Sequence, residues 1–188
     1  MSNIAIKGAA TGTGVFTLES PATNTNRTLT LPDEAGTILT TATAGVPIGG
    51  PAFNVGLITS NQNISAATYT KVQFNDIVFD TNSCWDETNY RFLPTVAGYY
   101  QINLVLYCLG NTFGEAIAVI SKNNVHHAWS VSRPEPTNRA SPGVSSLVYM
   151  NGSTDYIEGY AYIQTGTVSI GASSARTQMS GSLVRSAT

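Results

Sequence analysis

Residues 98–108 carry an unbroken two-residue alternation, which constrains the fold more than any other part of the chain. In an extended strand, successive side chains point to opposite faces. One face is then apolar and consists of Tyr100, Ile102, Leu104, Leu106 and Cys108. The other face consists of Tyr99, Gln101, Asn103, Val105 and Tyr107. The first set predicts the core side of a β-sandwich, whereas the second is too aromatic for an ordinary wet face and predicts a partner.

A second strand with two apolar faces is predicted at 155–163. Ile157, Gly159, Ala161 and Ile163 share one face, and Tyr156, Glu158, Tyr160 and Tyr162 share the other. Tyrosine buries a large ring while its hydroxyl keeps a polar partner, which suits a subunit interface. We therefore predict an interface formed by Tyr99, Tyr107, Tyr156, Tyr160 and Tyr162. The alternative is that these rings are half exposed or cover loops.

The composition of the chain favours strands and tight turns. Charged residues make up 11% of the sequence, against about 25% in typical soluble proteins. No helix is predicted, and strands are predicted at 52–58, 69–79, 90–93, 98–109, 114–121, 125–131, 144–150, 155–163, 166–172 and 178–185. Lys122-Asn123-Asn124 and Asn151-Gly152 each predict a hairpin turn, because asparagine and glycine accept positive φ. The proline-rich segment 132–143 is predicted to be a long exposed loop.

The first 41 residues differ in character from the remainder of the chain. Two short alternating strands are predicted at 15–19 and 27–32, with apolar side chains at Phe16, Leu18, Leu29, Leu31 and Ile38. So few apolar side chains cannot form a core for a segment of this length. The segment is therefore expected to attach to a larger body or to trimerise. The predicted organisation is 1–41 as an attachment segment, 42–51 as a Gly/Pro-containing linker and 52–188 as the head.

Composition argues against several classes of function. The net charge is −2 and no basic stripe is present, which argues against nucleic-acid binding. No apolar run approaches a membrane span, and no signal peptide is expected. Cys84 and Cys108 are too few for a disulfide scaffold. A bond between them is left open, and Cys108 is interpreted as a buried apolar side chain.

No catalytic group is predicted. His126 and His127 are neighbours on a strand and could share a metal ion only across a bulge. Cys108 lies on the predicted core face, where a thiol is inert. The oxygen-rich loop 81–89 offers Asp86 and Glu87 as a weak calcium candidate, although the usual ligand spacing is missing. No cofactor is otherwise expected.

The loop at 132–143 is the predicted contact with a partner. Arg133, Glu135 and Arg139 lie among prolines, which lower the entropy lost when a loop docks. The alternative is simple solvation of these charges. Trp129 precedes the loop and is either an anchor or a core residue, since strand alternation does not decide between them.

From about residue 51 onward, the chain resembles the globular head of complement component one-q, whose trimeric jelly roll is shared with tumour necrosis factor. The resemblance is carried by AF (52–53), YTKVQFN (69–75), YRFLPTVAGYYQI (90–102), NGSTDYIEGYAYI (151–163) and MSGSLV (179–184). Met179 stands where the family usually has an aromatic residue. The resemblance implies an all-β, ten-stranded-type jelly-roll β-sandwich that assembles as a homotrimer. The tyrosine faces predicted above would form the interface of that trimer. It implies no ligand.

Residues 16–40, FTLESPATNTNRTLTLPDEAGTILT, resemble a segment common in bacteriophage tail-fibre and virion-appendage proteins. The two resemblances together imply a non-enzymatic phage structural protein, made in the host cytoplasm and displayed on the virion. Segment 1–41 would anchor it to a capsid or tail protein. The head would then attach to a glycan or protein of the host surface, and threefold presentation would give avidity.

Three alternatives remain at this stage. The chain could decorate the capsid as a cement or head-fibre protein that stabilises the shell. It could be a polysaccharide depolymerase, which would need two carboxylates in one groove. It could also be a cellular complement-like binding module, a class disfavoured by the lack of a signal peptide and of a collagen repeat.

Overall fold

The computed structural model describes residues 11–15, 17, 19, 22–26, 28, 50–134 and 138–187. The chain divides into two compact units, 1–38 and 39–188, which are described separately. Strands are the only regular structure in the described ranges, so the predicted all-β class is confirmed. Accordingly, no described helix is long and apolar enough to cross a membrane.

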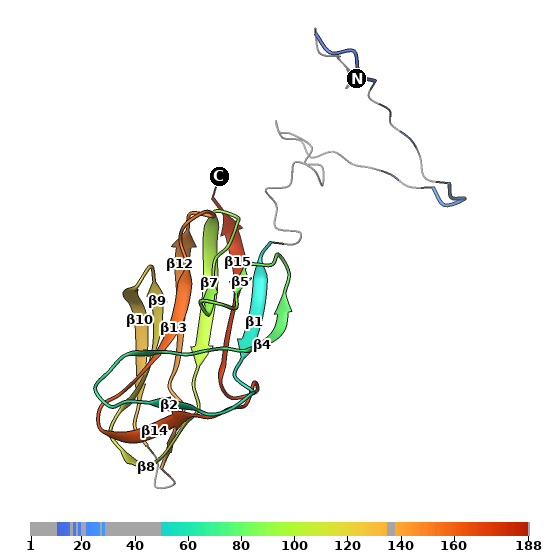
Figure 1. Cartoon of the computed structure of the whole chain (residues 1–188). Helices are drawn as coiled ribbons and strands as arrows, with labels where there is room; N and C mark the ends of the chain where they lie inside the picture. Colours follow the sequence, from blue (N-terminus) through green and yellow to red (C-terminus); the bar gives the residue numbers. More distant parts are fainter. Residues whose placement is uncertain are drawn as a thin grey trace. The chain divides into compact units, whose positions relative to one another are not determined.

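A five-stranded antiparallel sheet forms one layer of the head (Figure 1). Its order is β12 (Gly143–Met150), β7 (Gly98–Val105), β15 (Gln178–Ser186), β1 (Ala52–Gly56) and β4 (Asp76–Asp80). The first and last strands of the head therefore lie side by side in this sheet, where β1 pairs with β15. Such pairing of distant segments is typical of a jelly roll.

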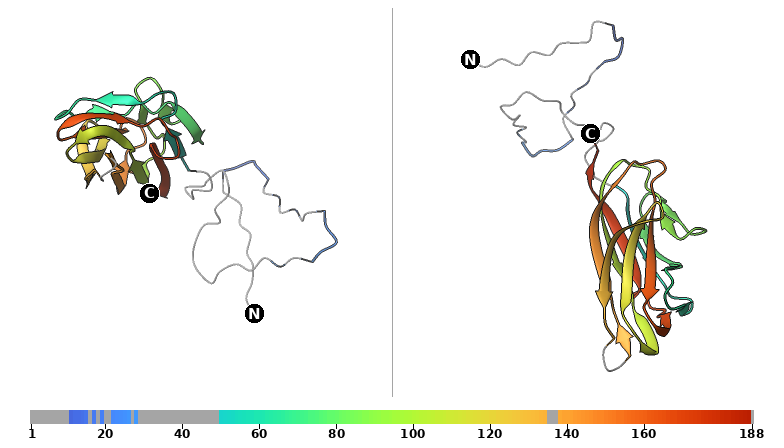
Figure 2. Two further views of the ribbon diagram at one scale, coloured as in Figure 1. Left: turned by 90° about the horizontal axis from the view of Figure 1, so that it is seen from below. Right: turned by 90° about the vertical axis from the view of Figure 1, so that its left-hand side faces the viewer.

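The second layer has the order β10 (Val125–Ser132), β9 (Ala116–Lys122), β13 (Ile157–Ile163), β6 (Arg91–Phe92) and β5 (Trp85–Asp86), and β3 (Thr70–Lys71) also pairs with β13. A smaller sheet closes one end of the sandwich (Figures 1 and 2). It consists of β11 (Arg139–Ala140), β8 (Cys108–Phe113), β14 (Gly166–Ile170) and β2 (Gln62–Ile64).

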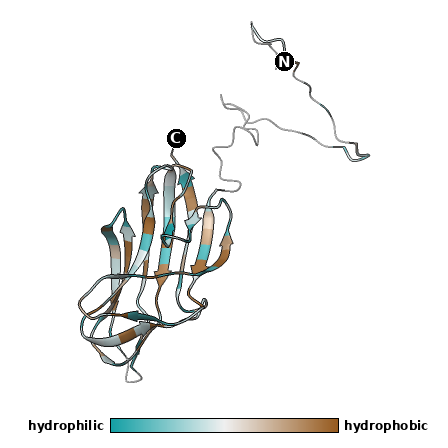
Figure 3. Cartoon of the chain, viewed as in Figure 1, coloured by the Kyte–Doolittle hydropathy of each residue, from teal (hydrophilic) through white to brown (hydrophobic). Residues whose placement is uncertain are grey.

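The core lies between the two layers and follows the predicted alternation. All five residues on the predicted core face of 98–108 are buried, and the strands alternate in hydropathy along their length (Figure 3). Phe53 stacks on Phe92 at a centroid distance of 4.2 Å, and Phe92 meets Tyr100 edge-on at 5.5 Å. The Tyr100 hydroxyl donates to the Val96 carbonyl at 2.7 Å, so this ring is buried with its polar atom satisfied.

One predicted hairpin is confirmed and the other is wrong. Asn123 and Asn124 both have positive φ and connect the paired strands β9 and β10. In contrast, Asn151-Gly152 connects β12 to β13, which lie in different sheets. The Asn151 side chain accepts hydrogen bonds from the backbone of Ser153, Thr154 and Asp155. This turn therefore carries the chain across the sandwich instead of back along the same sheet.

Two predicted strands are interrupted. The strand predicted at 69–79 is divided into β3 and β4, and that at 98–109 breaks between β7 and β8. At the second break the Leu106 N–H donates to the Pro142 carbonyl, and the Tyr107 N–H donates to Thr177 Oγ1. These bonds satisfy the backbone outside a strand ladder, so the chain can pass into the closing sheet.

The described residues of the N-terminal unit are exposed, and none lies in a strand. The strands predicted at 15–19 and 27–32 are therefore not formed at Val15, Thr17, Glu19 or Thr28. The five predicted anchoring residues lie outside the described residues. The predicted role of this segment remains a prediction.

Candidate functional site

The outer face of the five-stranded sheet is the first candidate surface, and we call it the β7-sheet face. It comprises the outward-pointing residues of four strands: Ala52, Asn54, Gly56, Tyr99, Gln101, Asn103, Val105, Gly143, Ser145, Leu147, Tyr149, Gln178, Ser180, Ser182 and Arg185. Leu147 is 52% exposed, and Tyr99 and Tyr149 are each 44% exposed. Exposed apolar side chains gathered on one face are typical of an interaction surface.

The centre of the β7-sheet face is polar but uncharged. Gln101 Nε2 donates to Ser145 Oγ at 2.7 Å, and Ser145 Oγ donates to Asn103 Oδ1 at 2.8 Å. Arg185 is the one charged residue that the four defining strands contribute to the face. Amides and hydroxyls can both donate and accept hydrogen bonds. The face therefore combines apolar contact area with groups that can pair with identical groups.

The five predicted interface tyrosines do not share one face. Tyr99 lies on the β7-sheet face, beside Tyr149 at a ring-centroid distance of 5.4 Å. Tyr107 lies at the end of the sandwich, just beyond β7. Tyr156, Tyr160 and Tyr162 lie on the outward side of the other layer, at or next to β13. One continuous flat interface on a single sheet face cannot include all five residues.

The outward tyrosines of β13 belong to an aromatic cluster. Tyr69 contacts His126 and Tyr162 at ring-centroid distances of 4.3 Å and 4.7 Å. Trp129 lies on β10, which β9 separates from β13. It is 64% exposed, so it is not a core residue. Val119 of β9 is paired in register with both Tyr160 and Trp129 and is buried. The cluster thus shields part of the sheet within a single head.

Glu158 is held inside this cluster by two partners. Its carboxylate accepts from Lys71 Nζ at 2.6 Å and from the Tyr160 hydroxyl at 3.1 Å. Burial, followed by the Glu158 charge, raises the pKa of Tyr160 to about 12. Breaking a buried pair by removing one partner leaves an uncompensated charge. Glu158 therefore has a structural role in this arrangement.

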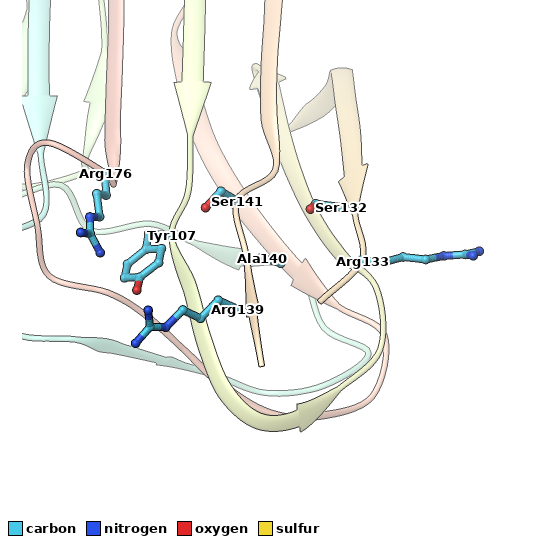
Figure 4. A pocket seen from close by; sticks show the side chains of 7 residues that line it. All are labelled: Tyr107, Ser132, Arg133, Arg139, Ala140, Ser141 and Arg176. Atoms are coloured by element: carbon cyan, nitrogen blue, oxygen red, sulfur yellow. The ribbon is translucent and has the colours of Figure 1, made fainter. Parts of the chain in front are cut away.

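The second candidate surface is an open pocket at the end of the sandwich, with a volume of about 680 Å³. Its lining residues come from β10, β11, the β7–β8 connection and the segment before β15 (Figure 4). They are Tyr107, Ser132, Arg133, Arg139, Ala140, Ser141 and Arg176. We call this site the arginine pocket.

Tyr107 lies between two arginines of the arginine pocket. The Arg176 guanidinium stands over the Tyr107 ring at 4.9 Å, which is a cation–π contact. The Arg139 side chain reaches toward the hydroxyl end of the same ring (Figure 4). The Tyr107 carbonyl accepts from the Gly171 N–H at 2.7 Å, so the backbone that carries the ring is held in place.

Of the predicted receptor-contact residues, the structure brings Arg133 and Arg139 to the same pocket. Arg133 points away from Tyr107 (Figure 4) and pairs with Glu115 at 3.1 Å. Glu135 lies outside the described residues. Sequence reasoning missed Arg176, which is distant in the sequence and has no local pattern that marks it.

The arginine pocket lies at the end of the head opposite to the point where the chain enters it. Pro51 accepts a hydrogen bond from Leu183, near the start of β7, where Gly98 pairs with Ser186. At its other end β7 reaches Val105, two residues before Tyr107. The C-terminus likewise lies at the end away from β8 (Figure 1).

The predicted calcium loop uses its carboxylate internally. Asp86 accepts from the Thr88 and Asn89 N–H groups, from Asn89 Nδ2 at 2.7 Å and from Arg91 Nε at 3.0 Å. The Asn89 side-chain bond is the main cause of a lowered Asp86 pKa. Glu87 is exposed. No group of three or more His, Cys, Asp or Glu residues suited to a metal occurs in the part of the chain that the structure describes.

The remaining reactive side chains are enclosed or dispersed. Cys84 and Cys108 are both free and buried, and burial raises the pKa of Cys108 to about 12. A bulge does occur at His127, between the paired residues His126 and Ala128. His126 packs against Tyr69. Cys84 and Cys108 therefore belong to the core, and His126 belongs to the outer aromatic cluster.

Comparison with known proteins identifies the fold. No protein-family model matches the chain, and no curated protein matches it. Among solved structures, the zebrafish complement 1qA globular domain is 14% identical with a TM-score of 0.55, covering 73% of this chain and 99% of that one. The Eiger TNF of S. frugiperda is 12% identical with a TM-score of 0.58, covering 74% and 96%. Murine APRIL is 9% identical with a TM-score of 0.57, covering 72% and 99%.

These likenesses show that the head has the jelly-roll fold of complement 1q and tumour necrosis factor domains. The predicted fold class is thereby confirmed. At such low sequence identities, the likenesses are evidence for the fold alone, because the same fold hosts many functions.

Proposed function

We propose that this chain is a non-enzymatic structural protein of a bacteriophage particle, whose head assembles as a homotrimer and attaches to the host surface. The observation that carries the proposal is the β7-sheet face, with its exposed apolar rim and its uncharged hydrogen-bonding centre. The N-terminal segment attaches the trimer to the virion.

A face of this chemistry suits contact between identical copies. Near a rotation axis each residue approaches its own copies, so a charged residue would meet like charges. Tyr99, Gln101 and Ser145 are neutral and can act as both donor and acceptor. Leu147 and Tyr149 add apolar area around them. Self-association through these positions therefore brings no like charges together.

The threefold number and the virion location rest on the resemblances noted in the sequence. The head resembles the trimeric complement one-q family, and 16–40 resembles a segment of phage appendage proteins. In this proposal Tyr99 is an interface residue, whereas Tyr156, Tyr160 and Tyr162 stabilise the single head. The lack of enzymatic activity is supported by the engagement of Glu158 with Lys71 and by the burial of Cys108.

Light scattering coupled to size exclusion tests the assembly. We expect a mass close to three times 19.8 kDa that persists on dilution to the micromolar range. A stable monomer would contradict the proposal, and a dimer would contradict its threefold symmetry. Mass spectrometry of purified phage particles tests the location, because a virion protein must co-purify with infectious particles.

Copy number on the particle separates host attachment from capsid decoration. A tail appendage is expected in small multiples of three, whereas a capsid decoration protein follows the many symmetry sites of the shell. Adsorption provides the second test. If the head is the attachment device, purified protein added in excess should block phage adsorption. A decoration protein should leave adsorption unchanged.

A further inference from the structure

We propose that the arginine pocket binds an acidic saccharide and holds its carboxylate or phosphate between Arg139 and Arg176. This deepens the proposed function, and it rests on that function for the assumption that the head presents a ligand site.

The pocket concentrates cations that have no described counter-ion. Lys71, Arg91, Lys122 and Arg133 each form an ion pair with a carboxylate. Among the lysines and arginines of 50–134 and 138–187, only Arg139, Arg176 and Arg185 form no ion pair with a described residue. Two of these three line the same pocket. In a chain of net charge −2, this is a local positive site.

Guanidinium groups favour oxyanions. Each presents several N–H donors in a planar fork that matches the oxygens of a carboxylate or phosphate. Arg139 and Arg176 lie on different sides of the Tyr107 ring (Figure 4). An oxyanion near the ring edge can therefore accept from both arginines. The Tyr107 hydroxyl forms no hydrogen bond with a described residue and provides another donor at the same place.

The remaining lining favours a sugar over a peptide. Ser132 and Ser141 contribute hydroxyl groups, and Ala140 is the only aliphatic side chain of the lining. A peptide anchors most strongly through aromatic or aliphatic side chains in apolar pockets, which this lining lacks. A saccharide instead offers hydroxyls that can form hydrogen bonds with Ser132, Ser141 and the Tyr107 hydroxyl. The volume of about 680 Å³ exceeds what one isolated oxyanion fills.

The position of the pocket also suits a ligand on another surface. It opens at the end of the head away from Pro51 and from the C-terminus. A polymer that approaches this end need not pass the point where the chain enters the head. Three heads in one trimer would present three such pockets, so a weak affinity for each would be multiplied by avidity.

Matched monosaccharides test the proposal directly. Full-length protein is titrated with glucose, glucuronic acid and glucose 6-phosphate, and binding is measured by NMR chemical shifts or by calorimetry. We expect both acidic sugars to bind at least about tenfold more tightly than glucose, because charge-assisted hydrogen bonds are the stronger kind. Raising the salt concentration from about 0.02 M to about 0.5 M should weaken their binding. Equal binding of glucose, or no binding of either acidic sugar, overturns the proposal.

Variants locate the site. Arg139→Gln and Arg176→Gln should each weaken binding of glucose 6-phosphate by about tenfold, corresponding to loss of one charge-assisted contact. Arg91→Gln is the matched control, because this arginine is paired with Asp86 and does not line the arginine pocket. The control should stay within about twofold of the unmodified chain. Unchanged binding in the Arg139→Gln, Arg176→Gln double variant would refute the site.

Inorganic phosphate and sulfate are the last two ligands to be tested. If they bind as tightly as glucose 6-phosphate, the pocket recognises any oxyanion and the saccharide part of the proposal fails. Light scattering on the same samples separates this inference from the proposed function. A monomer that binds acidic sugars contradicts the trimer alone, whereas a trimer that does not bind them contradicts the pocket alone.

Discussion

At the scale of single residues, Asp155 connects two turns of the head. It accepts from Asn123 Nδ2 at 2.7 Å and from the Asn151 N–H at 3.0 Å, and it pairs with Lys122 at 2.8 Å. Burial raises its pKa, but the bonds from Lys122, Asn123 and Asn151 outweigh burial, so the pKa is lowered below 3.8. The carboxylate thus ties the β9–β10 turn to the β12–β13 crossover.

We predict that Asp155→Asn lowers the free energy of unfolding by about 1–3 kcal/mol at neutral pH, because it removes charge-assisted acceptors. A lowered native pKa contributes stability above the unfolded pKa, and this stability is lost as pH falls through the native value. The difference between the two chains should therefore shrink as pH falls below 3.8. Urea unfolding as a function of pH measures it. Glu87→Gln, at an exposed site, should show almost no difference at any pH.

The cysteines provide a second residue-scale prediction. Both thiols are buried, and burial is the leading cause of their raised pKa values. At about pH 8 the native protein should therefore react negligibly with a thiol reagent, because the thiolate is the reactive form. Unfolding in guanidinium without a reductant should expose two thiols. Release of none would reveal a disulfide, and fast native labelling would reveal a reactive cysteine.

At the scale of elements, β12 tests the β7-sheet face. Leu147→Asp places a charge at a 52% exposed apolar position of this face. We expect the dissociation constant of the trimer to rise by at least about tenfold, since burying an unpaired charge costs several kcal/mol. Analytical ultracentrifugation over a dilution series measures the change.

Val125→Asp is the matched control. Val125 is a 68% exposed apolar residue of β10, in the other layer. This variant should assemble like the unmodified chain. If it dissociates and Leu147→Asp does not, the interface lies on the opposite face of the sandwich.

The turns show why the pairing of strands is harder to predict than the strands themselves. Asn123-Asn124 and Asn151-Gly152 have similar local chemistry, and both contain residues with positive φ. The first joins strands that pair with each other, while the second joins strands of different sheets. Turn residues specify a backbone conformation. The partner of the following strand is decided by long-range burial.

At the scale of the whole molecule, assembly should be coupled to stability. Association of native chains stabilises them by mass action. We therefore predict that the midpoint of thermal unfolding rises with protein concentration over about a hundredfold range. Differential scanning fluorimetry measures it at several concentrations. Leu147→Asp should flatten this dependence, and a midpoint independent of concentration in the unmodified chain would contradict an assembled head.

The alternation in the sequence determined the all-β class and the core face of β7, because side-chain direction in a strand has a period of two and needs no knowledge of partners. It placed Tyr100, Ile102 and Leu104 inside the sandwich correctly. It could not assign outward tyrosines to a common surface, because that depends on which sheet each strand joins.

Only the tertiary structure separated Tyr99 from Tyr160 and brought Arg176 beside Tyr107. Tyr107 leaves β7 at the point where the chain enters the closing sheet, and Arg176 arrives there from the segment before β15. Strand pairing between distant segments is driven by burial of the shared core. A pocket built from such segments therefore has no counterpart in any local stretch of the sequence.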